Sequence, residues 1–314
     1  MTIRRAAALV LSLGLGACVD DPTLGEGEQA VIGGSVSQEG EFPGVGALIV
    51  TFDGQSSLGC TGTLIAPDAV LTAAHCVDPA LWGDDVPGFT LALDTTTVMP
   101  SQIVAGRAKF AHEMFDIGAD ITPGLSQFYD VGVLLLAEPI TSVPPLRMPR
   151  PDQVEALVAD LDLEIAGYGR TDNATDDFGV MFDARTKLIS LNDSELQVGM
   201  GAPQPQNCNG DSGGPGFADL GDGRRVVGIV SRSFNGQECI NGGVDTRVDY
   251  YLEWIHSKVT SGIPCGSGLA EACPVDPGEE KDEGGCCSTG GGGGGGSVLL
   301  ALLVGVAMLV RRRG

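Results

Sequence analysis

Aromatic residues, positive charges and histidines are scarce in this sequence. Only 5% of its 314 residues are aromatic whereas 48 are glycine, a composition that favours many tight turns over a bundle of long helices. With 18 basic and 41 acidic residues the formal net charge is −23, so the surface should repel nucleic acid, and we expect no nucleic acid partner. Only three histidines are present, so there are few candidates for a general base.

The apolar stretch near the C-terminus is short for a membrane span. Residues 297–310 form a run of 14, whereas a spanning helix needs about 17 to 25, although the glycines at 290–296 could extend it. The arginines at 311–313 should stay cytoplasmic. With Cys286 and Cys287 before it, this order resembles the C-terminal sorting signals of surface proteins in myxobacteria and their relatives, which a processing enzyme removes. We expect residues 297–314 to be an apolar anchor or a sorting tail.

The N-terminus has the pattern of an export signal over residues 1–18. Arginines at 4–5 precede an apolar run at 6–15 and a small-residue cleavage site. The run 15–18 also resembles the bacterial lipobox, which makes Cys18 a candidate for lipidation; an ordinary signal peptide is the alternative. We expect an exported protein at the cell surface or outer membrane of a bacterium, or released from it. The nine cysteines agree with an oxidising compartment.

Residues 261–296 are rich in glycine, proline and acidic residues, and they predict an extended linker. Cys265 and Cys273 are candidates for a small loop disulfide within it. The late cysteines match no common zinc-finger spacing and have no histidine among them, so we predict no metal site.

Between residues 31 and 260, short apolar runs alternate with turns rich in Gly, Pro and Asp. Runs such as 46–52, 131–136 and 226–230 have the length and composition of strands. Aromatic and aliphatic residues at helical spacing in 249–259 predict a closing helix. The sequence therefore predicts an all-β domain with a short C-terminal helix.

Four short motifs in this region contain residues of the types used in catalysis. They are Val31-Ile32-Gly33-Gly34, Leu71-Thr72-Ala73-Ala74-His75-Cys76, Asp130-Val131-Gly132-Val133-Leu134-Leu135 and Gly210-Asp211-Ser212-Gly213-Gly214-Pro215. A serine hydroxyl is a weak nucleophile that needs a base and a group to orient that base. His112 lies in a polar stretch and His256 on the expected closing helix, which leaves His75 as the candidate base.

The four motifs and their order resemble the trypsin and chymotrypsin family of serine proteases over nearly the whole 31–260 region. The resemblance implies two six-stranded antiparallel β-barrels, no cofactor, and a catalytic triad of His75, Asp130 and Ser212. It implies an oxyanion hole made by Gly210 and Ser212. Ser231 matches the position of a hydroxyl that supports the aspartate. The implied disulfides join Cys60 to Cys76 and Cys208 to Cys239.

The same resemblance implies synthesis as a zymogen. Residues 19–30 would be a propeptide, and cleavage after Ala30 would free the amino group of Val31 to pair with Asp211. The residues before the cut, 28–30, include no Arg or Lys, so we do not expect a trypsin-type activating protease.

The expected substrate pocket departs from the family pattern. Gln206 stands where trypsins have an aspartate, so the residue before the cleaved bond (P1) is expected to be uncharged. Ser231, Ser233, Gly243 and Asp245 are the other expected pocket residues. Asp245 replaces a tyrosine and Arg232 a tryptophan, and basic P1 residues remain candidates if Asp245 reaches the pocket.

The sequence thus predicts a secreted or surface-anchored serine endopeptidase whose partners are protein or peptide substrates, an activating protease, and a membrane contacted through the termini. An esterase of the Gly-x-Ser-x-Gly type is disfavoured. In such esterases the catalytic histidine comes last in the chain, whereas here His75 precedes Asp130 and Ser212. The alternative function is a catalytically silent binding module with a protease fold.

Overall fold

The computed structural model describes residues 31–271, apart from positions 53–54, 92–102, 120–122, 170–178, 202–203, 209, 236–238, 240 and 260–261. The predicted export signal with Cys18, the propeptide up to Ala30 and the tail at 297–314 lie outside the described residues. None of the helices in the described part of the chain has the length and apolarity needed to cross a membrane.

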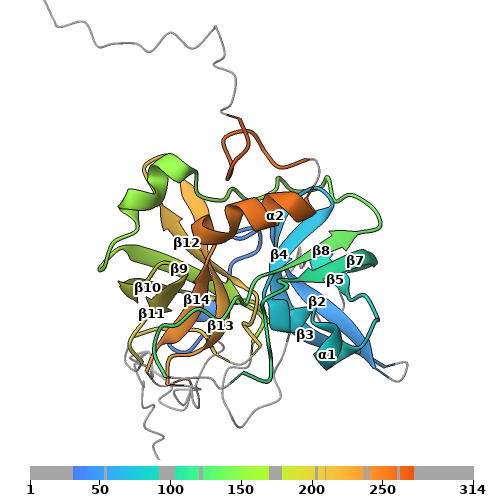
Figure 1. Ribbon diagram of the computed structural model, residues 1–314, viewed down its shortest axis with the longest axis horizontal. Coiled ribbons are helices and arrows are strands. Elements are labelled where there is room, and N and C mark those ends of the chain that lie inside the picture. Colours follow the sequence, from blue (N-terminus) through green and yellow to red (C-terminus); the bar gives the residue numbers. More distant parts are fainter. Residues whose placement is uncertain are drawn as a thin grey trace, which may run out of the picture. The chain divides into compact units, whose positions relative to one another are not determined.

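The N-terminal half forms one antiparallel sheet with the strand order β6-β5-β2-β3-β4-β8-β7 (Figure 1). Its strands are β2 (Val45–Phe52), β3 (Gln55–Ala66), β4 (Ala69–Thr72), β5 (Gly88–Leu91), β6 (Ile103–Val104), β7 (Gly106–Ala111) and β8 (Gly132–Leu136). The N–H of Gly106 donates to the carbonyl of Pro87 at 3.1 Å, so the start of β7 meets the residue before β5 and the sheet curls back on itself.

The C-terminal half forms a second antiparallel sheet with the order β1-β10-β11-β14-β13-β12-β9, and pairing of β9 with β10 closes it. Its strands are β1 (Ser35–Val36), β9 (Asp162–Gly167), β10 (Phe182–Leu191), β11 (Glu195–Val198), β12 (Pro215–Asp219), β13 (Arg224–Ser233) and β14 (Gly243–Arg247). Each sheet thus has six strands and one two-residue edge strand, β6 or β1. The predicted all-β architecture with two barrels is confirmed.

Short helical segments connect and close the sheets. They are the 3-10 turns η1 (Ala74–Cys76), η2 (Pro151–Ala156) and η3 (Asp249–Tyr251), with the helices α1 (Pro79–Trp82) and α2 (Leu252–Lys258). The predicted closing helix at 249–259 corresponds to η3 and α2. Leu252 and Ile255 of α2 are buried and pack into the same core cluster as the first sheet, which fixes the helix against the domain.

Residues 262–271 pack back onto the domain after α2, although the sequence assigns them to the linker. Ser267 is fully buried, and its hydroxyl accepts the N–H of Met148 at 2.9 Å. The N–H of Leu269 donates to Nε2 of His256 at 3.0 Å. Repeated Gly and Pro suggested an extended chain, but glycine without a side chain also permits close packing against a surface. The remainder of the predicted linker, 272–296, lies outside the described residues.

A buried arginine joins this C-terminal segment to the second sheet. Arg225, on β13, is 1% exposed and donates to the carbonyls of Met148 and Gly266, each at 2.8 Å. Its guanidinium also pairs with Asp222 at 2.6 Å. The segment therefore supplies part of the hydrogen bonding that an interior cation requires.

We predict that Arg225→Met lowers the free energy of unfolding by at least roughly 1–3 kcal/mol, the cost of one buried polar group left without its partner. The substitution removes the donors to Met148 and Gly266. Urea unfolding measures the loss. Arg185→Met is the control, because the Arg185 side chain is 87% exposed and the change should stay within about 0.5 kcal/mol. Equal losses in the two variants would contradict this role of Arg225.

Candidate active site

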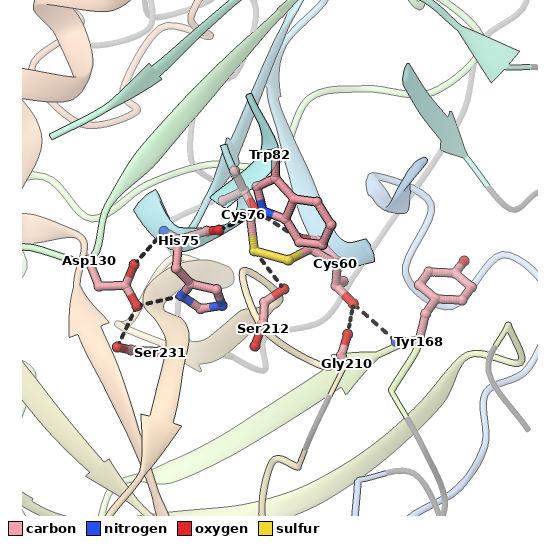
Figure 2. The surroundings of a disulfide bond; sticks show 11 residues. Cys60, His75, Cys76, Trp82, Asp130, Tyr168, Gly210, Ser212 and Ser231 are labelled. Carbon is pink, nitrogen blue, oxygen red and sulfur yellow. Dashed lines mark hydrogen bonds and ion pairs between the residues drawn. A yellow bond between two sulfur atoms is a disulfide. The ribbon is translucent and has the colours of Figure 1, made fainter. Parts of the chain in front are cut away.

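His75 and Asp130 form a hydrogen-bonded pair where strands β4 and β8 run side by side. The register aligns Thr72, the last residue of β4, with Gly132, the first of β8. Turn η1 after β4 and the segment before β8 are therefore brought to the same place. Nδ1 of His75 lies 2.8 Å from Oδ2 of Asp130, and the N–H of His75 donates to Oδ1 at 2.9 Å (Figure 2).

The second sheet completes the surroundings of Asp130. The hydroxyl of Ser231, on β13, donates to Oδ2 of Asp130 at 2.7 Å. The Asp130 side chain is fully buried, while that of His75 is 20% exposed. The carboxylate thus orients the ring through Nδ1 and leaves Nε2 available on the other side.

Opposing effects set the titration of this pair. Burial disfavours the charged ring of His75, but the charge of Asp130 and the hydrogen bond to it outweigh burial and raise the pKa of His75 above 6.5. Burial also disfavours the charged carboxylate, yet His75 and the Ser231 hydroxyl together lower the pKa of Asp130 below 3.8. The site therefore holds a charged carboxylate and a ring suited to accept a proton near neutral pH.

Ser212 lies in a glycine-rich turn that is held against the first sheet. Its carbonyl accepts the N–H of Thr61 on β3 at 2.9 Å and lies 3.6 Å from Sγ of Cys76. In Figure 2 the Ser212 side chain lies beside the ring of His75, on the side away from Asp130. The three residues of the predicted triad are thus brought together from separate parts of the chain.

Glycines allow this turn its conformation and its close approach. Gly210 and Gly213 have φ angles of +95° and +79°, which other residues rarely adopt. A Cβ at Gly213 would lie 2.0 Å from the hydroxyl of Thr72. The hydroxyl of Thr61 donates to the carbonyl of Gly210 at 3.2 Å. The turn containing Gly210 and Ser212, the predicted oxyanion donors, is therefore fixed against β3 and β4.

Both predicted disulfides are present. Cys60 on β3 is joined to Cys76 in η1, and Cys208 before the serine turn is joined to Cys239 after β13. Cys265 is also disulfide-bonded, while its expected partner Cys273 lies outside the described residues. Within the described ranges, the one cluster with metal-ligand geometry is Cys60, His75 and Cys76, and its two sulfurs are consumed by the disulfide.

Asp211, the residue before Ser212, meets the predicted mature N-terminus. Its buried carboxylate accepts the N–H groups of Cys208 at 2.9 Å and Gly169 at 3.0 Å, and also that of Val31. Burial outweighs these bonds and raises the pKa of Asp211 to about 6. Val31 is fully buried with a φ of +47°, which is strained for a β-branched residue. The predicted pair of Val31 and Asp211 is thus in contact.

A small cavity of about 60 Å³ opens beside Ser212. Its lining consists of Asn207, Cys208, Ser212, Val230, Ser231, Arg232, Ser233 and Cys239. Ser231 and Ser233 were predicted to line a pocket, whereas Asn207 was missed, although its place between Gln206 and Cys208 could have indicated it. Gly243 lies next to Asn207, since a Cβ there would lie 3.6 Å from the Asn207 Cβ.

Gln206 and Asp245, also predicted for the pocket, are fully buried and are not among the described residues that line the cavity. Oε1 of Gln206 accepts the N–H of Gly242 at 2.6 Å. Oδ1 of Asp245 accepts Nδ2 of Asn207 at 3.1 Å, so Asn207 separates Asp245 from the cavity. Among the described residues, Asp245 thus contacts the cavity lining through Asn207 and is not itself part of that lining.

Asp245 is an acid held in an unfavourable place. Its Oδ2 has no hydrogen-bond partner among the described residues and lies against Gly216 and Gly228, where an added Cβ would come within 2.7 Å. Burial, which outweighs the hydrogen bond from Asn207, and the nearby charge of Asp211 raise the pKa of Asp245 to about 7.

We predict that Asp245→Asn stabilises the protein more at pH 8 than at pH 5. Because the folded pKa is raised from 3.8 to about 7, the folded protein binds this proton more tightly than the unfolded chain, and stability falls as pH rises through that window. Asparagine does not titrate, and its side-chain oxygen can still accept the hydrogen bond from Nδ2 of Asn207. Thermal unfolding at the two pH values measures the effect, with the exposed Glu39→Gln as control. An equal shift at both pH values would refute it.

Comparison with known proteins agrees with this arrangement. The chain is 29% identical over 265 residues to phenoloxidase-activating factor 3 of Holotrichia diomphalia, and the match covers 73% of this chain and 72% of that protein. The family model described as Trypsin matches residues 31–255. This match spans most of the chain and contains the histidine, aspartate and serine described above, so the chain belongs to the trypsin family of serine endopeptidases.

Proposed function

We propose that Ser212 is the nucleophile of this endopeptidase, His75 its general base and acid, and Asp130 the carboxylate that orients His75. The observation that carries the proposal is the hydrogen bond of His75 Nδ1 to fully buried Asp130, with Ser212 on the opposite side of the ring (Figure 2). A carboxylate at Nδ1 keeps the proton there and leaves Nε2 free to accept the serine proton.

Peptide hydrolysis then proceeds in two halves. Oγ of Ser212 attacks the carbonyl carbon as His75 takes its proton, and the N–H groups of Gly210 and Ser212 stabilise the oxyanion. Collapse breaks the C–N bond, His75 gives the proton to the leaving amine, and an acyl-enzyme remains. Water then attacks the ester, with His75 again as base, and releases the acid and the free serine. No cofactor is needed for these steps.

We further propose that cleavage after Ala30 activates the enzyme. The support is the bond between the Val31 N–H and the carboxylate of Asp211, the residue next to Ser212. Cleavage would replace that amide by an ammonium group, and a cation is a stronger partner than an amide for a buried carboxylate. The serine turn would then be fixed by an ion pair. The residues before the cut make a trypsin-type activating protease unsuitable.

Substrates with an uncharged P1 residue fit the site best. The cavity beside Ser212 is small, and the amide of Asn207 rather than a carboxylate lies in its lining. Among the described residues of the lining, a basic P1 side chain would find no carboxylate, because Asp245 is hydrogen-bonded to Asn207 and does not line the cavity itself. This geometry supports the sequence-based expectation from Gln206.

We also propose that the enzyme is exported and acts at the bacterial cell surface or after release from it. The export pattern at 1–18, the lipidation candidate Cys18 and the anchor or sorting pattern at 297–314 support this location. The disulfides agree with an oxidising compartment.

The decisive experiment pairs N-terminal sequencing of the native enzyme with hydrolysis of a mixed peptide library. We expect active protein to start at Val31, to cleave after uncharged residues, and to react at Ser212 with a serine-directed organophosphorus reagent. Ser212→Ala should lose at least about 10⁴-fold in activity. Protein that starts at Val31 but neither cleaves nor reacts would favour the silent binding module.

The acid limb of the pH profile should follow His75. A protonated ring cannot accept the serine proton, so kcat/KM should fall as pH drops through a pKa above 6.5. Asp130→Asn removes the charge that raises this pKa; it should move the limb to lower pH and reduce kcat by about 10⁴-fold. His256→Gln is the control and should keep the limb in place, because His256 lies in helix α2 and is hydrogen-bonded to Leu269. A limb unmoved by Asp130→Asn would contradict the assignment.

A further inference from the structure

Arg232 and Glu195 form a buried ion pair next to the candidate active site. Nη1 of Arg232, on β13, lies 2.8 Å from Oε1 of Glu195, on β11, and Nη2 lies 2.9 Å from Oε2. The two side chains are 7% and 2% exposed. Such a two-point contact between planar groups fixes orientation as well as distance.

This ion pair binds the segment that leads to Asp130. Nη2 of Arg232 donates to the hydroxyl of Ser126 at 3.0 Å and to the carbonyl of Gly124 at 3.2 Å. Oε2 of Glu195 accepts the N–H of Ser126 at 2.6 Å. The guanidinium also lies 5.2 Å from the centre of the Phe128 ring. Every second residue from Gly124 to Phe128 therefore touches the pair.

An irregularity in β13 lets two neighbouring side chains hold the same segment. Successive side chains of a regular strand point to opposite faces, yet Ser231 bonds Asp130 while Arg232 bonds Ser126. The register between β13 and β14 shifts between Val230 and Arg232, as at a β-bulge, which re-aims side chains. Strand β13 thus holds the segment at two points.

The segment needs such support because its backbone is strained. Tyr129, directly before Asp130, has a φ of +56°, an uncommon value for a bulky residue that persists only when its surroundings impose it. Ser231 fixes the chain after Tyr129. Before Tyr129, the ion pair holds the N–H and hydroxyl of Ser126, while Asn192 and Ser194 donate to its carbonyl.

We propose that the Arg232–Glu195 pair is a positioning device for Asp130. It holds residues 124–129 in the strained conformation that presents the Asp130 carboxylate to Nδ1 of His75. Among the described contacts, neither side chain is hydrogen-bonded to His75, Asp130 or Ser212. Glu195 neutralises the charge of Arg232 where a tryptophan is usual in the family. This inference rests on the proposed triad.

The test uses a readout that does not depend on catalysis. In a Ser212→Ala background, the far-downfield proton resonance of His75 Nδ1–H reports the hydrogen bond to Asp130. Glu195→Gln removes the charge and is preferred because Glu195 is not part of the described cavity lining. We expect this resonance to shift and broaden in the variant. In the active enzyme, kcat should fall about 10- to 100-fold with KM little changed, and the acid limb should move to lower pH.

Asp249→Asn supplies the matched control. The Arg247–Asp249 pair lies in the same half of the protein with similar burial, 10% and 5%. Within the described residues this pair makes no direct hydrogen bond to the segment 124–130 and is linked to it only through Asn192, whose carbonyl accepts from Arg247 at 2.6 Å. The Asp249→Asn variant should lose stability as Glu195→Gln does, but it should keep the His75 resonance and the acid limb of the parent.

Arg232→Lys covers the case in which Glu195→Gln fails to fold, since it keeps the charge but not the planar fork. We expect it to fold and to show a smaller shift of the same resonance. A resonance and acid limb like those of the parent in the folded variant would overturn the inference and leave the pair a stabilising contact only. Because the resonance is measured in an inactive background, that failure is distinct from a failure of the proposed triad.

Discussion

The carboxylate of Asp130 is closed off from solvent, and a charged group in such a place is tolerated only when protein groups replace its lost hydration. Those groups come from both halves of the protein. His75 donates from turn η1 of the first sheet, and Ser231 donates from β13 of the second. The Asp130 carbonyl is held as well, because the hydroxyl of Thr246 on β14 donates to it at 2.9 Å. The two sheets must therefore meet before this single side chain is satisfied.

Three buried aspartates show how the number and kind of partners decide the state of a carboxyl group. Asp130 has a cation-forming ring, a hydroxyl and a backbone N–H, and its pKa is lowered. Asp211 has three backbone N–H groups, and its pKa rises to about 6. Asp245 has one side-chain amide, and its pKa rises to about 7. Equal burial thus lowers the pKa of the aspartate with the strongest partners and raises the pKa values of the two with weaker ones.

The features of this structure that depend on short stretches of sequence were predictable. Short apolar runs between turn residues gave the strands, and the surroundings of His75, Asp130 and Ser212 are recognisable because each lies inside a contiguous motif. The two disulfides were implied by the resemblance to the family. Contacts that depend on strand register could not be predicted from the sequence. Arg232 and Glu195 are 37 positions apart and meet only because β11 and β13 both pair with β14.

Two further features escaped prediction for physical reasons. Asp245 was placed in a pocket, but its orientation depends on Gly216 and Gly228, which leave room behind the cavity wall. Composition alone made residues 262–271 look like a linker. The hydrogen bond from buried Arg225 to this segment could not be predicted from composition. A single interior side chain of this kind can fix a segment of low intrinsic order.

The packing of residues 262–271 extends the folded part of the chain beyond the family-model match. The family-model match ends at residue 255, inside α2, whereas packed residues continue to 271. The residues beyond the match supply a carbonyl to the interior guanidinium of Arg225 and an N–H to the ring of His256. The stretch that the family model matches is therefore shorter than the packed stretch, and a boundary drawn at residue 255 would separate Arg225 from Gly266, to whose carbonyl it is hydrogen-bonded in the interior.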